Sequence, residues 1–238
     1  MNHYRSILPL LLIFLLNISC SKEPELLSGK ISGCVNFMDA GYNASYKLTG
    51  IRMTLKQDER LIASDTTPEN TFTFDHIPYG KYLLTAEKEG CIPASRVVEH
   101  IGGYSPTITT LWIYQIPSFT LSMDSVVQTD SYYVNVYGQL GNYNIKAYIG
   151  LVFLCFVNDN PTVDADHYTQ KMVAFAAAEN ISGNRITARI NNDYGFQAAP
   201  GDTLFLRTYP MSWGENLYNF HKQYLGNPSN VTSFIVRF

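Results

Sequence analysis

From Lys30 onward, apolar and polar residues alternate in many short runs. The clearest run is IRMTLK at 51–56, in which Ile, Met and Leu alternate with Arg, Thr and Lys. Strict alternation of this kind is typical of a β-strand with one buried face. Similar runs recur at short intervals with turn residues between them, and no helical period of useful length develops. The pattern therefore predicts an all-β fold of the sandwich or barrel type.

In the first half of the chain, the runs are bounded by Gly, Pro, Asn and Asp, which favour turns. The polar stretch 39–47, which contains Tyr42 and Tyr46, is expected to be a loop. The expected strands cover residues 31–37, 51–55, 61–66, 72–74, 81–86 and 107–115.

One motif in this half is more specific than alternation. Residues 72–82, FTFDHIPYGKY, place two aromatics on one face, then a Pro/Gly reversal, then a tyrosine that returns to the core. Together with segments 33–35, 49–55 and 88–90, the motif resembles the carboxypeptidase regulatory-like family. The resemblance implies a transthyretin-like β-sandwich over residues 30–116. It also implies a non-catalytic accessory or spacer module.

The stretch Ile116-Pro117-Ser118 interrupts the strand pattern, and a second series of strands begins after it. The expected strands cover residues 119–127, 132–137, 148–157, 171–178, 186–190, 203–210 and 231–237. Their number is that of an immunoglobulin or fibronectin type III sandwich, and the run 201–210 resembles a late strand of such domains. The sequence thus predicts two tandem β-sandwich domains, the second over residues 117–238.

The N-terminus has a different character. Arg5 precedes an apolar run, 7–16, which is shorter than the roughly 20 residues of a membrane-spanning helix. Small and polar residues follow, and then Cys20. The segment resembles a bacterial lipoprotein signal, which implies that residues 1–19 are removed, that Cys20 carries the lipid, and that residues 20–29 form a tether. The alternative is an ordinary cleaved signal peptide with a chance cysteine.

Two acidic residues, Glu23 and Glu25, follow Cys20 closely. They resemble a signal for export to the outer face of the outer membrane in Gram-negative bacteria. We therefore expect a lipid-anchored, surface-exposed outer-membrane protein. A periplasm-facing orientation, with the glutamates as a solvated linker, is the alternative.

The charge and the cysteines of the chain limit which partners and metal sites are expected. The formal net charge is −3 and no cluster of Lys and Arg occurs, so neither a nucleic-acid footprint nor a polybasic membrane patch is expected. Apart from Cys20, the cysteines are Cys34, Cys91 and Cys155, and none has zinc-site spacing. Cys155 lies in an apolar run and is expected to be buried. Pairing of Cys34 with Cys91 stays open.

Candidate chemistry is sparse. The histidines after the leader are scattered, and none has a nucleophile-elbow context. The oxygen-rich stretch 158–167 lacks the register of an EF-hand, so a solvated loop is favoured over a calcium site. We expect no cofactor, no metal and no enzymatic activity. A hydrolase with an unrecognised site is the remote alternative.

The stretch 211–230 is longer than a hairpin between the last two strands requires. It carries a candidate ligand surface of Trp213, Tyr218, Phe220 and Tyr224. Exposed rings of this kind stack on sugars or anchor a protein partner, and the alternative is that they pack on the sandwich. The favoured function is capture or scaffolding of a glycan or envelope protein, and the alternative is a structural spacer or surface-fibre component.

Overall fold

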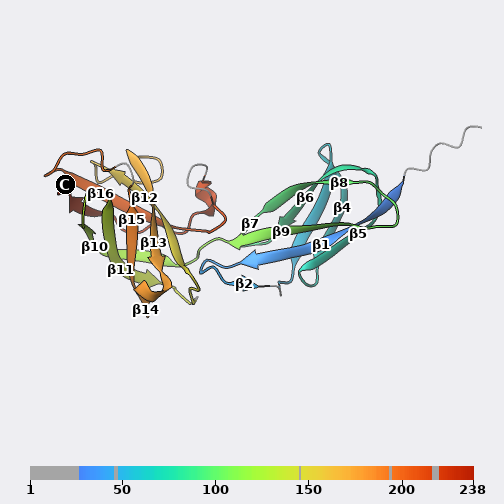
Figure 1. Cartoon of the computed structure of the whole chain (residues 1–238), viewed down its shortest axis with the longest axis horizontal. Helices are drawn as coiled ribbons and strands as arrows, with labels where there is room; N and C mark the ends of the chain where they lie inside the picture. Colours follow the sequence, from blue (N-terminus) through green and yellow to red (C-terminus); the bar gives the residue numbers. More distant parts are fainter. Residues whose placement is uncertain (1–26, 46–47, 145, 193–194, 216–219) are drawn as a thin grey trace, which may run out of the picture.

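The computed structural model describes residues 27–45, 48–144, 146–192, 195–215 and 220–238. Its regular structure is almost entirely β-strand, arranged as two sandwiches that lie end to end (Figure 1). The start of β1 and the C-terminus lie at opposite ends of the molecule (Figure 1). Within the described residues, no helix is long and apolar enough to span a bilayer. The predicted all-β, tandem-sandwich fold is confirmed.

The first sandwich has two facing sheets. One has the order β2-β1-β9-β7, with β5 also paired to β1, and the other has the order β4-β3-β6-β8. Strands β1 and β9 run parallel, from the pair Ile31↔Thr107 to the pair Met38↔Tyr114. The strands are β1 (Ser28–Met38), β2 (Ala44–Ser45), β3 (Ile51–Gln57), β4 (Arg60–Thr67), β5 (Thr71–Pro78), β6 (Gly80–Glu87), β7 (Cys91–Ile92), β8 (Ala94–His100) and β9 (Thr107–Gln115).

The 72–82 motif has the geometry that its pattern indicates. Phe72 and Phe74 are buried in the core, with ring centroids 5.9 Å apart. Tyr82 returns to the same core after the reversal, and its hydroxyl donates a hydrogen bond of 2.7 Å to the carbonyl of Pro78. Burial raises the pKa of the Tyr82 phenol above its ordinary value. The tyrosine therefore ties the end of β5 to β6.

Strand β8 was not predicted from the sequence. Among the residues that the structure describes, it pairs with β6 alone, and most of its residues are exposed, with Val98 and His100 buried. An edge strand that buries so few side chains leaves little apolar alternation to detect.

The second sandwich contains every strand predicted for it, and the sheet order is β10-β11-β15-β13-β12-β16-β17. Strands β13 and β15 share only two residue pairs, Ala174↔Ile190 and Phe175↔Arg189. The sheet turns over at this narrow contact, so β10, β11 and β15 face the remaining strands in an immunoglobulin/fibronectin-like sandwich. The elements are β10 (Thr120–Gln128), β11 (Tyr133–Gly141), β12 (Gly150–Asn158), β13 (Gln170–Ala177), η1 (Ala178–Asn180), β14 (Ile181–Ser182), β15 (Arg185–Asn191), β16 (Thr203–Met211), η2 (Lys222–Tyr224) and β17 (Thr232–Ile235).

Side-chain amides close the second sandwich where its first and last strands meet. Asn230 accepts a hydrogen bond from the Met123 N–H at 2.7 Å and donates one to the Met123 carbonyl at 3.0 Å. The Gln128 side chain likewise accepts the Arg237 N–H at 2.7 Å. These amides satisfy backbone groups that a longer β17 would otherwise have paired.

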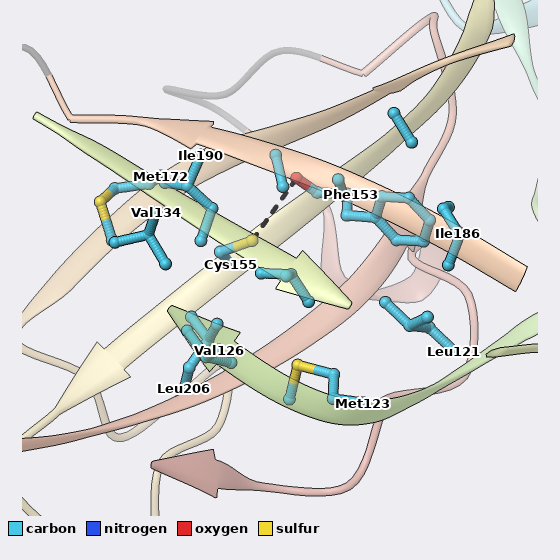
Figure 2. Close-up of a cluster of buried hydrophobic side chains, with 14 of the residues drawn as sticks. Leu121, Met123, Val126, Val134, Phe153, Cys155, Met172, Ile186, Ile190 and Leu206 are labelled. Carbon is cyan, nitrogen blue, oxygen red and sulfur yellow. Dashed lines mark hydrogen bonds between the residues drawn. The ribbon is translucent and has the colours of Figure 1, made fainter. Parts of the chain in front are cut away.

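Strand β12 is buried on both faces. Leu151, Phe153 and Cys155 point into the core between the two layers, part of which Figure 2 shows around Cys155. Burial raises the pKa of the Cys155 thiol above its usual range, so this residue is a packing group, as its sequence context indicates. Leu154 and Phe156 point outward and are nevertheless fully buried. A second apolar cluster must therefore cover the outer face of β12.

Candidate functional site

The outer face of β12 is covered by two loops. Val163 and Ala165 come from the loop after β12, and Leu225 comes from the stretch between β16 and β17. Phe156 lies at the centre, with ring centroids 4.9 Å from Tyr168 and 5.4 Å from Tyr209. The long 211–230 stretch is thus, in its described part, a lid on the sandwich. Below, this apolar group is called the outer cluster.

Trp213 is half-buried at the edge of the outer cluster. Its ring meets Phe175 at 5.9 Å and Tyr42 of the first sandwich at 4.7 Å, both edge-on. Its Nε1 is buried and finds no hydrogen-bond acceptor within the described ranges. Trp213 therefore occupies the position of a packing residue between the two sandwiches.

The other predicted ligand-surface residues are less central. Phe220 is half-buried on Phe156, at 5.5 Å, with the Lys171 ammonium 5.2 Å from its ring centroid. Tyr224 is half-buried and contacts the ring of His221 at 5.5 Å. Tyr218 and Cys20 lie outside the described residues. Ligand binding by these aromatics stays a prediction, but the described ones are packed rather than presented as a free platform.

A turn of the first sandwich reaches into the second. The Asp39 carboxylate accepts hydrogen bonds from the backbone N–H groups of Gly41 and Asn43, each at 2.8 Å, and from the Asn43 amide. These bonds preorganise the turn and hold Tyr42 at φ 65°, a left-handed value uncommon for a non-glycine residue. Ala40, at the tip of the same turn, belongs to the core cluster of the second sandwich.

Hydrogen bonds and close packing complete this joint. The Asn43 amide donates to the Lys146 carbonyl at 2.6 Å, and the Tyr148 N–H donates to the Gly41 carbonyl at 2.8 Å. Gly214, which follows β16, lies against Tyr114 near the end of β9. A Cβ on residue 214 would meet the Tyr114 ring at 2.4 Å. Here "the joint" means the 39–43 turn with Tyr114, Trp213 and the residues that they contact. It holds the sandwiches by several interactions besides the linker.

Side chains of the two sandwiches pack together across the domain boundary expected at 116/117. Within the described residues, no strand pairs across it, yet Ala40 and Tyr42 pack against residues beyond it. Independent folding of fragments 28–116 and 117–238 stays a prediction. Each fragment would expose side chains that the joint covers.

A polar pocket of about 350 Å³ lies on β11 and β15, next to the β14 hairpin. A β-bulge at Asp124 interrupts the β10–β11 pairing beside the pocket, and the backbone of Gly138 forms part of its lining. The Tyr137 ring, 38% exposed, lines the pocket together with polar and charged groups. The lining residues are Asp124, Tyr137, Gly138, Glu179, Asn180, Ser182, Arg185, Ile186 and Thr187.

Histidines and acidic groups serve local structure. Buried His100 bonds Thr107 Oγ1 at 2.7 Å and the Ile77 carbonyl at 3.1 Å. Asp164 accepts bonds from the backbone and ring of His167; some desolvation raises the pKa of this carboxyl, but these bonds outweigh it and lower the pKa overall. Among the described residues, no group of three or more His, Cys, Asp or Glu is arranged to hold a metal ion.

The three described cysteines are free. Cys34 lies beside Thr110 on one side of β9, and Cys91 lies beside Gln115 on the other. Those positions are five residues apart along β9, or about 16 Å. A disulfide requires Cα atoms within about 7 Å, so Cys34 and Cys91 are not placed to pair.

No protein-family model matches the chain, and a search of curated proteins gave no match. Several solved structures are similar at low identity. A protein of the DUF3823 family from Bacteroides uniformis is 15% identical, over 88% of this chain and 99% of that one, with a TM-score of 0.33. The major pilin subunit of Bacillus cereus is 13% identical, over 87% of this chain and 69% of that one, with a TM-score of 0.36. The fibronectin(III)-like modules of Clostridium thermocellum CbhA are 14% identical, over 90% and 92%, with a TM-score of 0.27. Values of this size assign the chain neither to a family nor to a function.

Proposed function

We propose that this chain is a non-catalytic, lipid-anchored protein of the bacterial outer membrane that acts as a stiff spacer or scaffold. The observation that carries the proposal is the joint, in which Trp213 packs on Tyr42 and the Asp39-capped turn enters the second sandwich. Separate capture modules need only a flexible linker between them. A preorganised joint instead favours a fixed orientation, which a spacer requires and simple tethering does not.

The first sandwich adds support as a module type. Its 72–82 motif and its seven longer strands fit the carboxypeptidase regulatory-like resemblance, which implies a spacer role. With the start of β1 and the C-terminus at opposite ends (Figure 1), an anchor at Cys20 would hold the second sandwich away from the membrane. In this arrangement the far end of the second sandwich is what a partner would meet.

Anchoring is tested at the cysteine. In cells given labelled palmitate, Cys20→Ser should lose the label and leave the membrane fraction, because its hydroxyl cannot form the thioether. Cys34→Ser is the matched control and should keep both properties. Equal labelling of the two variants would contradict lipid anchoring.

Glycan capture remains a second candidate because of the Tyr137 pocket. An exposed ring offers a stacking face for a sugar, and the mixture of carboxylate, guanidinium, amide and hydroxyl groups can meet both the donors and the acceptors of sugar hydroxyls. Ligand sites of this kind combine an apolar platform with a few polar groups. The pocket is more open to this use than the packed rings at Trp213 and Phe220.

A glycan array probed with the unlipidated fragment from Ser21 onward would test capture. We expect Tyr137→Ala to weaken the strongest interaction about tenfold, which corresponds to roughly 1.4 kcal/mol, with an unchanged melting temperature. Tyr132→Ala, which removes a ring of comparable exposure (53%) elsewhere on this sandwich, should have no effect. If no glycan binds, or if the two variants bind alike, the pocket is not a glycan site.

A further inference from the structure

Three chain segments meet at the end of the first sandwich that faces away from the second. The Tyr79 N–H donates to the Leu27 carbonyl at 2.8 Å, and the Gly103 N–H donates to the Ser28 carbonyl at 3.0 Å. Gly102 lies against the same strand start, because a Cβ there would meet the Leu27 carbonyl oxygen at 2.5 Å. The β8–β9 loop therefore lies beside the beginning of β1, as Figure 1 also shows.

The side chains that this end presents are apolar or aromatic. Tyr104 is fully exposed, and Ile101, Leu27 and Tyr79 are 78%, 64% and 55% exposed. Large apolar side chains gathered at one exposed place usually mark an interaction surface. We call these four residues the apolar end.

Hydrogen bonds hold the apolar end in place, and the described lysines beside it are paired with carboxylates. Buried His100 precedes the β8–β9 loop, and its ring bonds Thr107 at the other end of that loop and the Ile77 carbonyl of β5. The neighbouring lysines are paired with carboxylates, Lys30 with Asp75 at 3.1 Å and Lys81 with Glu99 at 3.8 Å. Within the described residues, an approaching apolar phase would therefore meet lysines whose charges are balanced by carboxylates.

The length of chain before Leu27 identifies what covers this surface. Leu27 is the seventh residue after Cys20, and a chain of that length reaches at most about 24 Å. A lipid on Cys20 lies in the bilayer, so the point at which the chain enters β1 cannot lie far from it. The apolar end surrounds that entry point.

We propose that the apolar end rests on the lipid bilayer, with Tyr79 and Tyr104 at the headgroup level and Leu27 and Ile101 directed toward the acyl chains. Tyrosine is enriched at this level in membrane proteins because its ring is apolar and its hydroxyl polar. A lipid chain holds a protein more firmly when a second contact assists it. The inference rests on the proposed anchoring at Cys20 and adds an orientation to it, with the long axis of the molecule directed away from the membrane.

The test uses the full lipidated protein in phosphatidylcholine vesicles that contain brominated lipid, which quenches nearby tryptophan. Tyr104→Trp adds a reporter at the apolar end, and Tyr132→Trp adds one at an exposed position (53%) of the second sandwich. Trp112 and Trp213 give the same background in both variants. We expect the fluorescence of the added tryptophan to fall at least twofold at position 104 and to stay unchanged at position 132.

Flotation of the vesicles separates the two ways to fail. If the protein floats with the vesicles but the variants are quenched equally, it is anchored and the apolar end does not touch lipid. If the protein does not float and Cys20 carries no lipid by mass spectrometry, the proposed anchoring at Cys20 is wrong. The proposed contact of the apolar end with the bilayer is then wrong as well. Tyr104→Ser should leave the melting temperature unchanged, since the ring makes no buried contact.

Discussion

Replacing Phe156 with alanine should destabilise the second sandwich by about 3–5 kcal/mol, the range for removing a fully buried aromatic side chain. Phe156 is fully buried although it points away from the main core, and its ring contacts Tyr168, Tyr209 and Phe220. Its loss would leave a cavity beneath two loops. Chemical unfolding followed by tyrosine fluorescence and circular dichroism measures the change.

The matched control for Phe156 is a half-buried aromatic on the opposite layer. Tyr133 contacts Arg189 at 3.7 Å and lies outside both clusters. Tyr133→Ala should therefore cost less than half as much. If Phe156→Ala were as mild as Tyr133→Ala, the outer cluster would contribute little, and the aromatics of the 211–230 stretch would be available for another role.

Trp213→Ala should lower the free energy of unfolding by about 2–3 kcal/mol, less than for a fully buried tryptophan because the ring is half-buried. It should also loosen the joint, because Trp213 is the ring that Tyr42 packs against. Small-angle X-ray scattering of the unlipidated fragment from Ser21 onward would then show a broader distribution of overall dimensions. This outcome distinguishes a spacer from a ligand platform, since a platform residue could be removed with the joint intact.

Trp112→Ala is the control for Trp213. That ring is 37% exposed on the outer face of β9 in the first sandwich. We expect its removal to cost less than about 1 kcal/mol and to leave the scattering profile unchanged. A Trp213→Ala protein that keeps its melting temperature and its dimensions but loses a ligand would overturn the spacer function and restore the ligand surface predicted from the sequence.

The sequence predicted the strands well because each one leaves a local signature. Alternation identified β3 and β6, and the run at 148–157, with Cys155 expected to be buried, identified β12. Strand β8 escaped because its burial depends on a single neighbouring strand and only its last residues face the core. Local pattern reports the periodicity of a segment and not the partner that covers it.

The joint could not be predicted for the same reason. Tyr42 and Trp213 are far apart in the sequence, and both lie in stretches that read as loops. The length of the 211–230 stretch correctly marked it as unusual, but length alone does not tell a packed lid from an exposed platform. Only the position of the two sandwiches decides that Trp213 meets another ring.

The parallel pairing of β1 and β9 has a mechanical consequence. A pull between the start of β1 and the second sandwich enters at Ser28 and leaves beyond Gln115, at opposite ends of two adjacent strands. Such a load acts along the strands, so their evenly spaced hydrogen bonds resist it together in shear instead of opening one after another. The first sandwich is therefore arranged to resist tension along its long axis.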